Sequence, residues 1–303
     1  MNKIAVIDLG TNTFQLSIYQ CNRKSFSLLF SHRVGVSLGL NGILEKKIHR
    51  EALDRGIETM TSFKKMCDDW QVEKINAVGT SALRDASNNK EFCNEILSKT
   101  GIQIEIINGL KEAELIYKGV IKSFKKKEDC VIMDIGGGST EIIYVLNKKP
   151  EIFSFNIGIS RLFQLKNWND PFSKDDIAFL IDAMEKECSC INSLPNINNF
   201  IGVAGSFETV YEMIKLKAIN SFNSTLKFNS QKMYCVIQEL INSSMLERTL
   251  NPHIIPIRKQ FISIAALQMK WFLDKIQAKN KYISTNSLSE GVLFDFMNKK
   301  AEI

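Results

Sequence analysis

Two stretches of the sequence, residues 8–19 and 134–145, align with each other without a gap. The first reads DLGTNTFQLSIY and the second DIGGGSTEIIYV. In each, an aspartate ends an apolar run, small residues follow, and a second apolar run begins. Because glycine permits unusual backbone conformations and leaves no Cβ in the way, such a turn can direct N–H groups and hydroxyls around a phosphate. The repeat predicts two domains, each built around the same hairpin.

Strand and helix patterns alternate in the first half of the chain. Runs rich in β-forming residues at 3–10, 14–20 and 25–31 predict a meander of three strands. After this meander, the spacing of apolar residues and the local composition predict helices that alternate with strands. The elements expected are a helix at 46–69, a strand at 75–81, a helix at 90–99, a strand at 102–109 and a helix at 110–123.

The charged run KKKED at residues 125–129 separates this pattern from a second one. Residues 131–158 predict another three-stranded meander. A helix at 173–190, a strand at 200–205 and mostly helical sequence to the end are expected after it. Alternation of this kind is typical of layered α/β folds. The sequence therefore predicts an N-terminal domain at 1–122 and a C-terminal domain with helical additions at 123–303.

Composition narrows the class of protein. At 303 residues and 45% hydrophobic content the chain can form two packed cores. It has no apolar run of eighteen residues and no signal-like start, so we expect a cytoplasmic protein without a membrane partner. Seven scattered cysteines without a CxxC pair indicate neither a disulfide framework nor a zinc site. The net charge of +6 favours an anionic partner but does not specify it.

Six motifs occur in order along almost the whole chain. They are DLGTNTFQL (8–16), GTSALRDASN (79–88), INGLKEAELIYKGV (107–120), MDIGGGSTEI (133–142), NIGISRL (156–162) and GVAGSFET (202–209). The duplicated turns resemble those of the superfamily of acetate kinase, sugar kinases, Hsp70 and actin. Within it, the motifs resemble those of the exopolyphosphatase and guanosine pentaphosphatase family (Ppx/GppA), in its short two-domain form.

This resemblance implies a fold and an activity. The fold is α/β, with two duplicated actin-like (ribonuclease H-like) ATPase domains and a cleft between them. The activity is hydrolysis of a phosphoanhydride with Mg²⁺ as the divalent cation. The expected partner is inorganic polyphosphate or guanosine pentaphosphate as substrate, without nucleic acid or membrane, and family habit suggests a homodimer.

Glu112 is the candidate general base. Hydrolysis needs a group that orients or deprotonates an in-line water. Glu112 lies in the first turns of the helix after IING, where a carboxylate also interacts favourably with the helix dipole. The resemblance favours the catalytic interpretation, because the family's catalytic glutamate immediately precedes the alanine of this motif, as Glu112 precedes Ala113.

Arg84 is the candidate phosphate-contacting cation. A guanidinium binds phosphate oxygens through two parallel N–H bonds. From the sequence alone, a partner such as Asp85 or another nearby acid is an equal alternative. The resemblance implies that Arg84 and Asp134 act in catalysis with Glu112.

The two turns supply the remaining candidates. A carboxylate beside phosphate is reconciled if a divalent cation or a water lies between them. The resemblance implies that the ion or its waters are held by Asp8, Asp134 and Glu141. The phosphate-binding candidates are Thr11, Asn12, Thr13, Gly136, Gly137, Gly138, Ser139, Thr140, Gly205 and Ser206.

Two positions depart from the family pattern. Ser289 precedes Glu290 and Gly291 where an arginine is typical, and Gln260 stands where an Arg-x-Asp pattern has its aspartate. These changes affect the expected substrate contacts or helix pairing of the second domain. They leave the preferred chain length of the substrate open.

Four functions are compatible with these residues. The first is an exopolyphosphatase, and the second is a guanosine pentaphosphate phosphohydrolase with the same mechanism. The third is an ATP-dependent kinase of the wider superfamily, and the fourth is a regulator that binds polyphosphate or nucleotide without turnover. We rank the regulator low because the carboxylates at positions 8, 112, 134 and 141 are all present.

Overall fold

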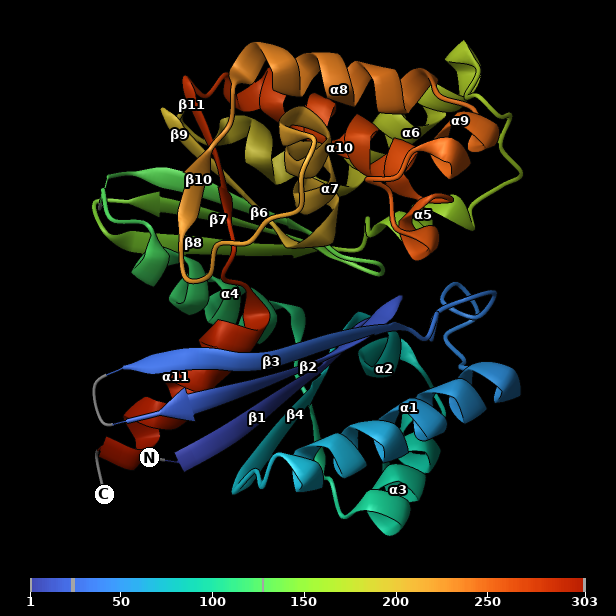
Figure 1. Cartoon of the computed structure of the whole chain (residues 1–303). Helices are drawn as coiled ribbons and strands as arrows, with labels where there is room; N and C mark the ends of the chain where they lie inside the picture. Colours follow the sequence, from blue (N-terminus) through green and yellow to red (C-terminus); the bar gives the residue numbers. More distant parts are fainter. Residues whose placement is uncertain (1, 23–24, 127, 302–303) are drawn as a thin grey trace. The chain divides into compact units, whose positions relative to one another are not determined.

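The computed structural model describes residues 2–22, 25–126 and 128–301 and divides the chain into two compact units (Figure 1). Unit 1 consists of Met1–Gly119 together with Ser287–Ile303, and unit 2 of Val120–Asn286. The sequence prediction placed everything after residue 122 in the second domain. The structure instead assigns the C-terminal helix to unit 1, where it packs on the first strand.

Unit 1 contains a five-stranded sheet with the strand order β3-β2-β1-β4-β5. Strands β1, β2 and β3 pair antiparallel, whereas β4 pairs parallel with β1 and β5 pairs parallel with β4. The strands are β1 (Asn2–Leu9), β2 (Thr13–Cys21), β3 (Phe26–Gly35), β4 (Lys74–Gly79) and β5 (Ile104–Ile106). The helices are α1 (Arg50–Asp69), α2 (Ser81–Asp85), α3 (Asn89–Thr100), α11 (Leu288–Ala301) and α4 (Gly109–Ser123), of which residues 109–119 belong to unit 1.

Unit 2 contains a six-stranded sheet with the order β10-β11-β9-β6-β7-β8. Its strands are β6 (Cys130–Ile135), β7 (Thr140–Leu146), β8 (Lys149–Phe155), β9 (Asn199–Val203), β10 (Thr225–Lys227) and β11 (Asn280–Ser284). Its α-helices are α5 (Ile159–Phe163), α6 (Lys174–Glu187), α7 (Ala204–Lys215), α8 (Ser230–Asn242), α9 (Met245–Leu250) and α10 (Ile262–Ile276). Two short 3₁₀ helices are η1 (Ser189–Ser193) and η2 (Pro256–Arg258).

The two sheets repeat one topology. Starting from the outer strand of the meander, unit 1 runs β3-β2-β1-β4-β5 and unit 2 runs β8-β7-β6-β9-β11, with parallel and antiparallel pairs in the same places. Strand β10 is an addition at the edge of the second sheet. This repetition confirms the predicted α/β class with duplicated actin-like domains.

Two short strands of unit 2 were not expected from the sequence. Most of the chain after residue 205 is helical, as predicted, but Thr225–Lys227 forms β10 and Asn280–Ser284 forms β11, which is parallel to β9. Strand β11 is short and follows helix α10 after a break of only three residues. Its five residues, NKYIS, are too few to show a periodicity of their own, so pairing with β9 decides their conformation.

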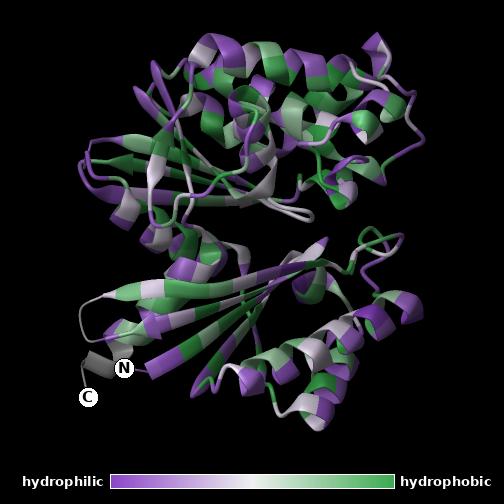
Figure 2. Cartoon of the chain, viewed as in Figure 1, coloured by the Kyte–Doolittle hydropathy of each residue, from purple (hydrophilic) through white to green (hydrophobic). Residues whose placement is uncertain are grey.

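Alternation along the strands separates two faces of the unit 1 sheet. Ala5, Ile7 and Leu9 of β1 belong to the core that α1 and α3 cover. Because successive side chains point to opposite faces, Asp8 lies on the other face. The strands of both sheets carry long apolar segments, whereas many turns of the surrounding helices are hydrophilic (Figure 2). The polar positions of β1 and β2 are therefore kept away from the main core.

Two glycines let α4 and α11 approach each other closely within unit 1. A Cβ on Gly291 would overlap the carbonyl of Leu115, and one on Gly119 would overlap the carbonyl of Ser287. Next to this crossing, Tyr19 Oη donates a 2.5 Å hydrogen bond to the buried carboxylate of Glu290. The Glu-Gly pair near the end of the sequence thus attaches α11 to unit 1.

Ser289, the position that departs from the family pattern, lies in the same contact region. Its side chain is 1% exposed and belongs to unit 1. The sequence prediction considered this position as part of the second domain. The serine is therefore a packing position of the first unit.

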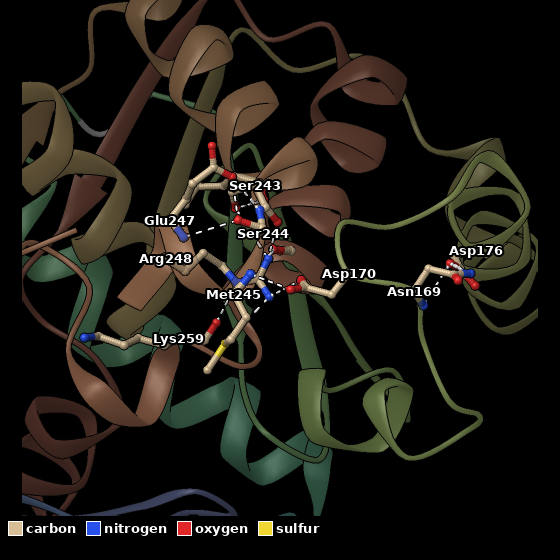
Figure 3. Close-up of polar contacts among 11 residues, drawn as sticks. Asn169, Asp170, Asp176, Ser243, Ser244, Met245, Glu247, Arg248 and Lys259 are labelled. Carbon is tan, nitrogen blue, oxygen red and sulfur yellow. Dashed lines mark hydrogen bonds and ion pairs between the residues drawn. The ribbon is translucent and has the colours of Figure 1, made fainter. Parts of the chain in front are cut away.

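A buried arginine connects the helical part of unit 2 (Figure 3). Arg248 in α9 donates through Nε to the carbonyl of Lys259 at 2.8 Å and through Nη1 to Ser263 Oγ at 2.9 Å and to the carbonyl of Ser243. Its Nη2 lies 2.7 Å from Asp170 Oδ1. One guanidinium therefore connects three segments that are separate in the sequence, residue 170, residues 243–248 and residues 259–263.

Within the described part of the chain, no helix combines the length and the apolar character needed to cross a membrane.

Candidate phosphate-binding and catalytic site

The turn of unit 1 follows β1. The N–H of Gly10 donates to the carbonyl of Thr13 at 3.0 Å, and a Cβ on Gly10 would lie only 2.9 Å from that oxygen. The segment after β3 stabilises the turn, because the N–H groups of Val36 and Ser37 donate to the carbonyl of Asn12. These contacts fix the backbone in the tight form that the D-x-G pattern predicted.

The turn of unit 2 has the same geometry. The N–H of Gly136 donates to the carbonyl of Ser139 at 3.0 Å, and a Cβ on Gly136 would lie 2.9 Å from that oxygen. Both repeats thus close in the same way. Two glycine residues, Gly137 and Gly138, occupy the middle of this turn where unit 1 has Thr11 and Asn12.

The start of α5 holds the carbonyl side of this second turn. The N–H groups of Ile159 and Ser160 donate to the carbonyls of Gly136 and Gly137 at 3.0 and 2.8 Å. Arg161 Nε donates to the carbonyl of Gly138 at 2.9 Å. No hydrogen bond within the described residues uses the N–H groups of Gly137 or Gly138. This arrangement leaves backbone donors of the turn for an anion.

Thr140 and Gln268 form the buried support of the turn. Thr140 is fully buried and aligns with the core residue Phe14 of unit 1. The amide of Gln268, a buried residue of α10, donates to the carbonyl of Ile157 at 2.5 Å and approaches Thr140 Oγ1 at 3.5 Å. The hydroxyl of Thr140 therefore lies on the interior side, and this position does not support its predicted contact with phosphate.

Asp8 is a buried carboxylate at the end of β1. Within the described residues its Oδ1 has no hydrogen-bond partner. Burial and, to a smaller extent, the nearby charge of Glu112 raise the pKa of Asp8 to about 7, against the opposing charge of Arg33. A buried polar atom without a partner is uncommon, and it marks this position as a candidate ligand site.

Glu112 lies in the first turn of α4, which Asn108 caps by accepting a 2.8 Å hydrogen bond from the N–H of Lys111. Its carboxylate is 8% exposed and lies 2.9 Å from Arg84 Nη1. Burial raises the pKa of Glu112, and the charge and hydrogen bond of Arg84 oppose this rise.

Arg84 lies in α2, directly after the parallel strand β4. Besides Glu112, its Nη1 reaches the carbonyl of Ile107 at 3.3 Å, and its Nε lies 3.9 Å from Asp85. The sequence left Asp85 or another acid open as the partner. The structure shows that Glu112 is the closer one, so the two predicted catalytic side chains of unit 1 form a pair.

Asp134 and Glu141 are neighbours in unit 2. They lie directly opposite each other on β6 and β7, so both side chains are on one face of the sheet. Glu141 is 1% exposed and accepts a 2.7 Å hydrogen bond from Ser154 Oγ. Two adjacent carboxylates suit Mg²⁺, which usually takes one or two carboxylates and completes its coordination with water and phosphate.

The predicted metal trio is divided between the units. Asp8 belongs to unit 1, whereas Asp134 and Glu141 belong to unit 2. In the residues that the structure describes, no three His, Cys, Asp or Glu side chains are grouped so that they could hold a metal ion. Within one unit, the donor set is therefore the Asp134 and Glu141 pair.

Gly205 and Ser206 lie at the start of α7, after β9. Ala204 before them has a φ of 67°, a left-handed conformation that is unusual for alanine. A Cβ on Gly205 would overlap the guanidinium of Arg258, which also lies 3.0 Å from Glu208. The positive end of the helix and a guanidinium thus lie together, which is a favourable environment for an anion.

Sequence reasoning did not find the roles of two polar side chains at these turns, Gln268 and Gln15. A single glutamine in the mostly apolar run ISIAALQMKWF was the available signal for the first. Gln15 aligns with Glu141 in the duplicated stretches, and this replacement of an acid by an amide was the signal for the second.

This chain is a two-domain α/β protein of the actin-like class. The repeated fold, the buried carboxylates and the glycine turns, whose N–H groups could bind phosphate, define this class. Residues 17–300 match the family model described as Ppx/GppA phosphatase family, and the chain belongs to this family. The predicted family is thereby confirmed.

Individual relatives are similar over most of the chain. It is 26% identical to the bifunctional 3-dehydroquinate synthase/phosphatase of Fusobacterium nucleatum, over 98% of this chain and 47% of the relative. It is 24% identical to a guanosine-5'-triphosphate,3'-diphosphate pyrophosphatase of Photobacterium profundum, over 97% of this chain and 59% of the relative. The chain thus spans about half the length of these two relatives.

A solved structure covers the chain more evenly. An exopolyphosphatase from Cytophaga hutchinsonii is 29% identical, with a TM-score of 0.92 over 98% of both chains. The fold of this chain is therefore similar to that of the Cytophaga hutchinsonii structure.

Proposed function

We propose that this chain is an exopolyphosphatase, which hydrolyses the terminal phosphate of inorganic polyphosphate with a water molecule activated by Glu112. The pair of Glu112 and Arg84 is the observation that carries the proposal. A buried carboxylate with a raised pKa is suited to take a proton from water near neutral pH. Its position in the motif that the family resemblance assigns to the catalytic base supports the same role.

Each turn supplies its own donors for phosphate in this proposal. Backbone N–H groups of Gly137 and Gly138 and the hydroxyl of Ser139 donate to phosphate oxygens in unit 2. The turn of unit 1 donates through Thr13 and its neighbours. Donors fixed in advance stabilise developing charge without having to reorganise during the reaction.

Arg84 stabilises the charge of the phosphoryl group, and Glu112 accepts the proton of the attacking water. The guanidinium leaves Glu112 and contacts the oxygens of the terminal phosphoryl group. The water oxygen bonds to the terminal phosphorus while the anhydride P–O bond breaks, and the water proton passes to Glu112. The products are orthophosphate and a polyphosphate shortened by one phosphate.

Asp134 and Glu141 would hold Mg²⁺, the cation that the resemblance implies. When bound, the ion neutralises charge on the phosphate oxygens. Removal of divalent cations with EDTA should abolish phosphate release, and added Mg²⁺ should restore it.

A phosphate-release assay with polyphosphate, guanosine pentaphosphate and ATP tests the proposal. We expect release from polyphosphate in Mg²⁺ and a loss of about 100-fold or more in the Glu112→Gln protein. Unchanged release by Glu112→Gln would reject the base, and no release from polyphosphate by the parent protein would reject the function.

Guanosine pentaphosphate is the second candidate substrate. The similarity to the Photobacterium profundum pyrophosphatase favours it. Both substrates end in phosphoanhydrides, so the same residues could act on either. Competition between them in one assay would show which substrate has the higher kcat/KM.

A further inference from the structure

Three polar residues lie side by side across the unit 1 sheet. Asp8 on β1 is opposite Gln15 on β2, and Gln15 is opposite Arg33 on β3. Directly paired residues of antiparallel strands share one face. The three side chains therefore form a row, called here row 1, on the face that carries Asp8.

Unit 2 has the equivalent row, called here row 2. Asp134 on β6 is opposite Glu141 on β7, and Glu141 is opposite Ser154 on β8. The same hydrogen bond occurs in both rows, because the third residue donates to the second: Ser154 to Glu141 and Arg33 to Gln15. The rows thus share geometry and differ in charge.

The difference in charge suits the two rows to different ligands, a divalent cation in row 2 and a phosphate in row 1. Row 2 has two carboxylates, the chemistry of a divalent cation site. Row 1 has one carboxylate, a neutral amide and a guanidinium, and a guanidinium binds phosphate. The duplicated hairpins have therefore diverged from each other at matching positions.

Gln15 positions the guanidinium of Arg33. Its Oε1 accepts from Arg33 Nε at 3.0 Å and from Nη2 at 2.8 Å, and its amide nitrogen donates to Ser17 Oγ at 3.2 Å. The amide is thus held at both ends. An acceptor without charge orients the guanidinium and, in that contact, does not cancel its positive charge.

Arg33 also acts on the carboxylate at the other end of the row. Its charge lowers the pKa of Asp8, against the effects of burial and Glu112. The charges of Arg33 and Glu112 therefore act on the same carboxyl group in opposite directions.

We propose that Arg33, oriented by Gln15, is a substrate-binding residue that contacts a phosphate of an inorganic polyphosphate chain. This inference rests on the proposed function and adds a specificity determinant to it. Polyphosphate carries negative charge along its whole length, so a cation beside the first turn can bind a phosphate other than the one being released.

Binding of inorganic tripolyphosphate by calorimetry tests this role. The parent is the Glu112→Gln protein with Mg²⁺, in which the probe is not consumed. Arg33→Ser introduces the residue that row 2 has at the equivalent position, and we expect affinity to fall about 10-fold or more, as for loss of charge-assisted hydrogen bonds. Arg33→Lys keeps the charge but loses the forked geometry, so we expect an intermediate loss.

Gln15→Glu tests the effect of the charge in row 1 while the hydrogen-bond acceptor for Arg33 is kept. It retains an acceptor for Arg33 but adds a second carboxylate beside Asp8, and we expect weaker tripolyphosphate binding as well. Arg50→Ser is the matched control, because Arg50 is an exposed arginine paired with Asp54 on α1. We expect no change in affinity for this variant.

The outcomes distinguish the inference from the function beneath it. If the parent binds tripolyphosphate and Arg33→Ser binds it equally well, the role of Arg33 is rejected while the proposed function stands. If the parent does not bind tripolyphosphate at all, the proposed function fails and the inference fails with it. A loss confined to the Arg33 and Gln15 variants, in proteins with the parent's circular dichroism spectrum, supports the inference.

Discussion

Arg84 Nη1 lies 2.9 Å from Glu112 Oε2, so the cation that is expected to contact phosphate also controls the protonation of the proposed base. Burial raises the pKa of Glu112 and Arg84 lowers it. The base must be ionised to accept a proton, so activity should rise with pH through this pKa. In Arg84→Met the lowering is lost, and the acid limb of the kcat/KM profile should move to higher pH.

Profiles of kcat/KM against pH for the parent, Arg84→Met and Arg84→Lys measure this shift. The lysine variant retains a positive charge, so its acid limb should lie closer to that of the parent. An acid limb at the same pH in all three proteins would contradict the assignment of Glu112 as the titrating base.

Asp8 predicts a pH dependence of stability. Its pKa is about 7 in the folded protein and near 3.8 in the unfolded chain, so the folded state holds the proton more tightly. The stabilisation is complete below about pH 4 and is lost as pH rises to about 7. Between pH 5 and pH 7 the contribution should fall by about 2 kcal/mol.

Asp8→Asn removes this titration because the amide stays neutral. Relative to the parent, the free energy of unfolding of Asp8→Asn should therefore rise between pH 5 and pH 7. Urea unfolding at both pH values measures it, with the exposed Asp182→Asn as control. A constant difference between parent and Asp8→Asn at the two pH values would contradict the raised pKa.

Gln268 should affect function more than stability. Gln268→Met keeps a similar volume and removes a buried acceptor, Oε1, that has no partner within the described residues. The same change leaves the carbonyl of Ile157 without this donor. The two effects oppose each other, so we expect a stability change within about 1 kcal/mol.

The turn of unit 2 loses support in Gln268→Met, and we expect KM for polyphosphate to rise several-fold more than kcat falls. Steady-state kinetics and urea unfolding on one preparation separate the two effects. Gln238→Met, at an exposed position on α8, is the control. A large loss of stability with an unchanged KM would assign Gln268 to the core alone.

Arg248 is expected to be a major contributor to the stability of unit 2. Its side chain is buried, and removing it leaves several carbonyls and hydroxyls without a donor. Arg248→Met should lower the free energy of unfolding by about 3 kcal/mol. Asp170→Asn should cost about 1 kcal/mol or less, because Asp170 is partly exposed. Equal losses for the two variants in chemical denaturation would contradict this order.

The sequence predicted those parts of the fold that local patterns determine. The alignment of residues 8–19 with 134–145 was sufficient to predict two equivalent hairpins. Each turn needs glycine, at position 10 or 136, because a Cβ there would lie too close to a backbone carbonyl oxygen. The pairing of Arg84 with Glu112 could be named only as one of several alternatives. It depends on α2 and α4 meeting after parallel strands, a contact between distant segments that no local spacing encodes.

The place of the C-terminal helix was missed for a similar reason. Glu290 and Gly291 read as part of a helical second domain, but their partners are Tyr19 and Leu115 in unit 1. Thr140 was misjudged because the sequence does not show which side of the hairpin faces α10. Its alignment with the core residue Phe14 contained this information.

The crossing of α4 and α11 has a consequence for the order in which the protein can fold during synthesis. Unit 2 is continuous in the sequence, whereas unit 1 needs Ser287–Ile303 to complete it. During synthesis on the ribosome, unit 2 can finish folding before α11, which packs on the sheet of unit 1, has been synthesised. A circular permutant that joins this helix directly to β1 would make the first unit continuous and remove the delay.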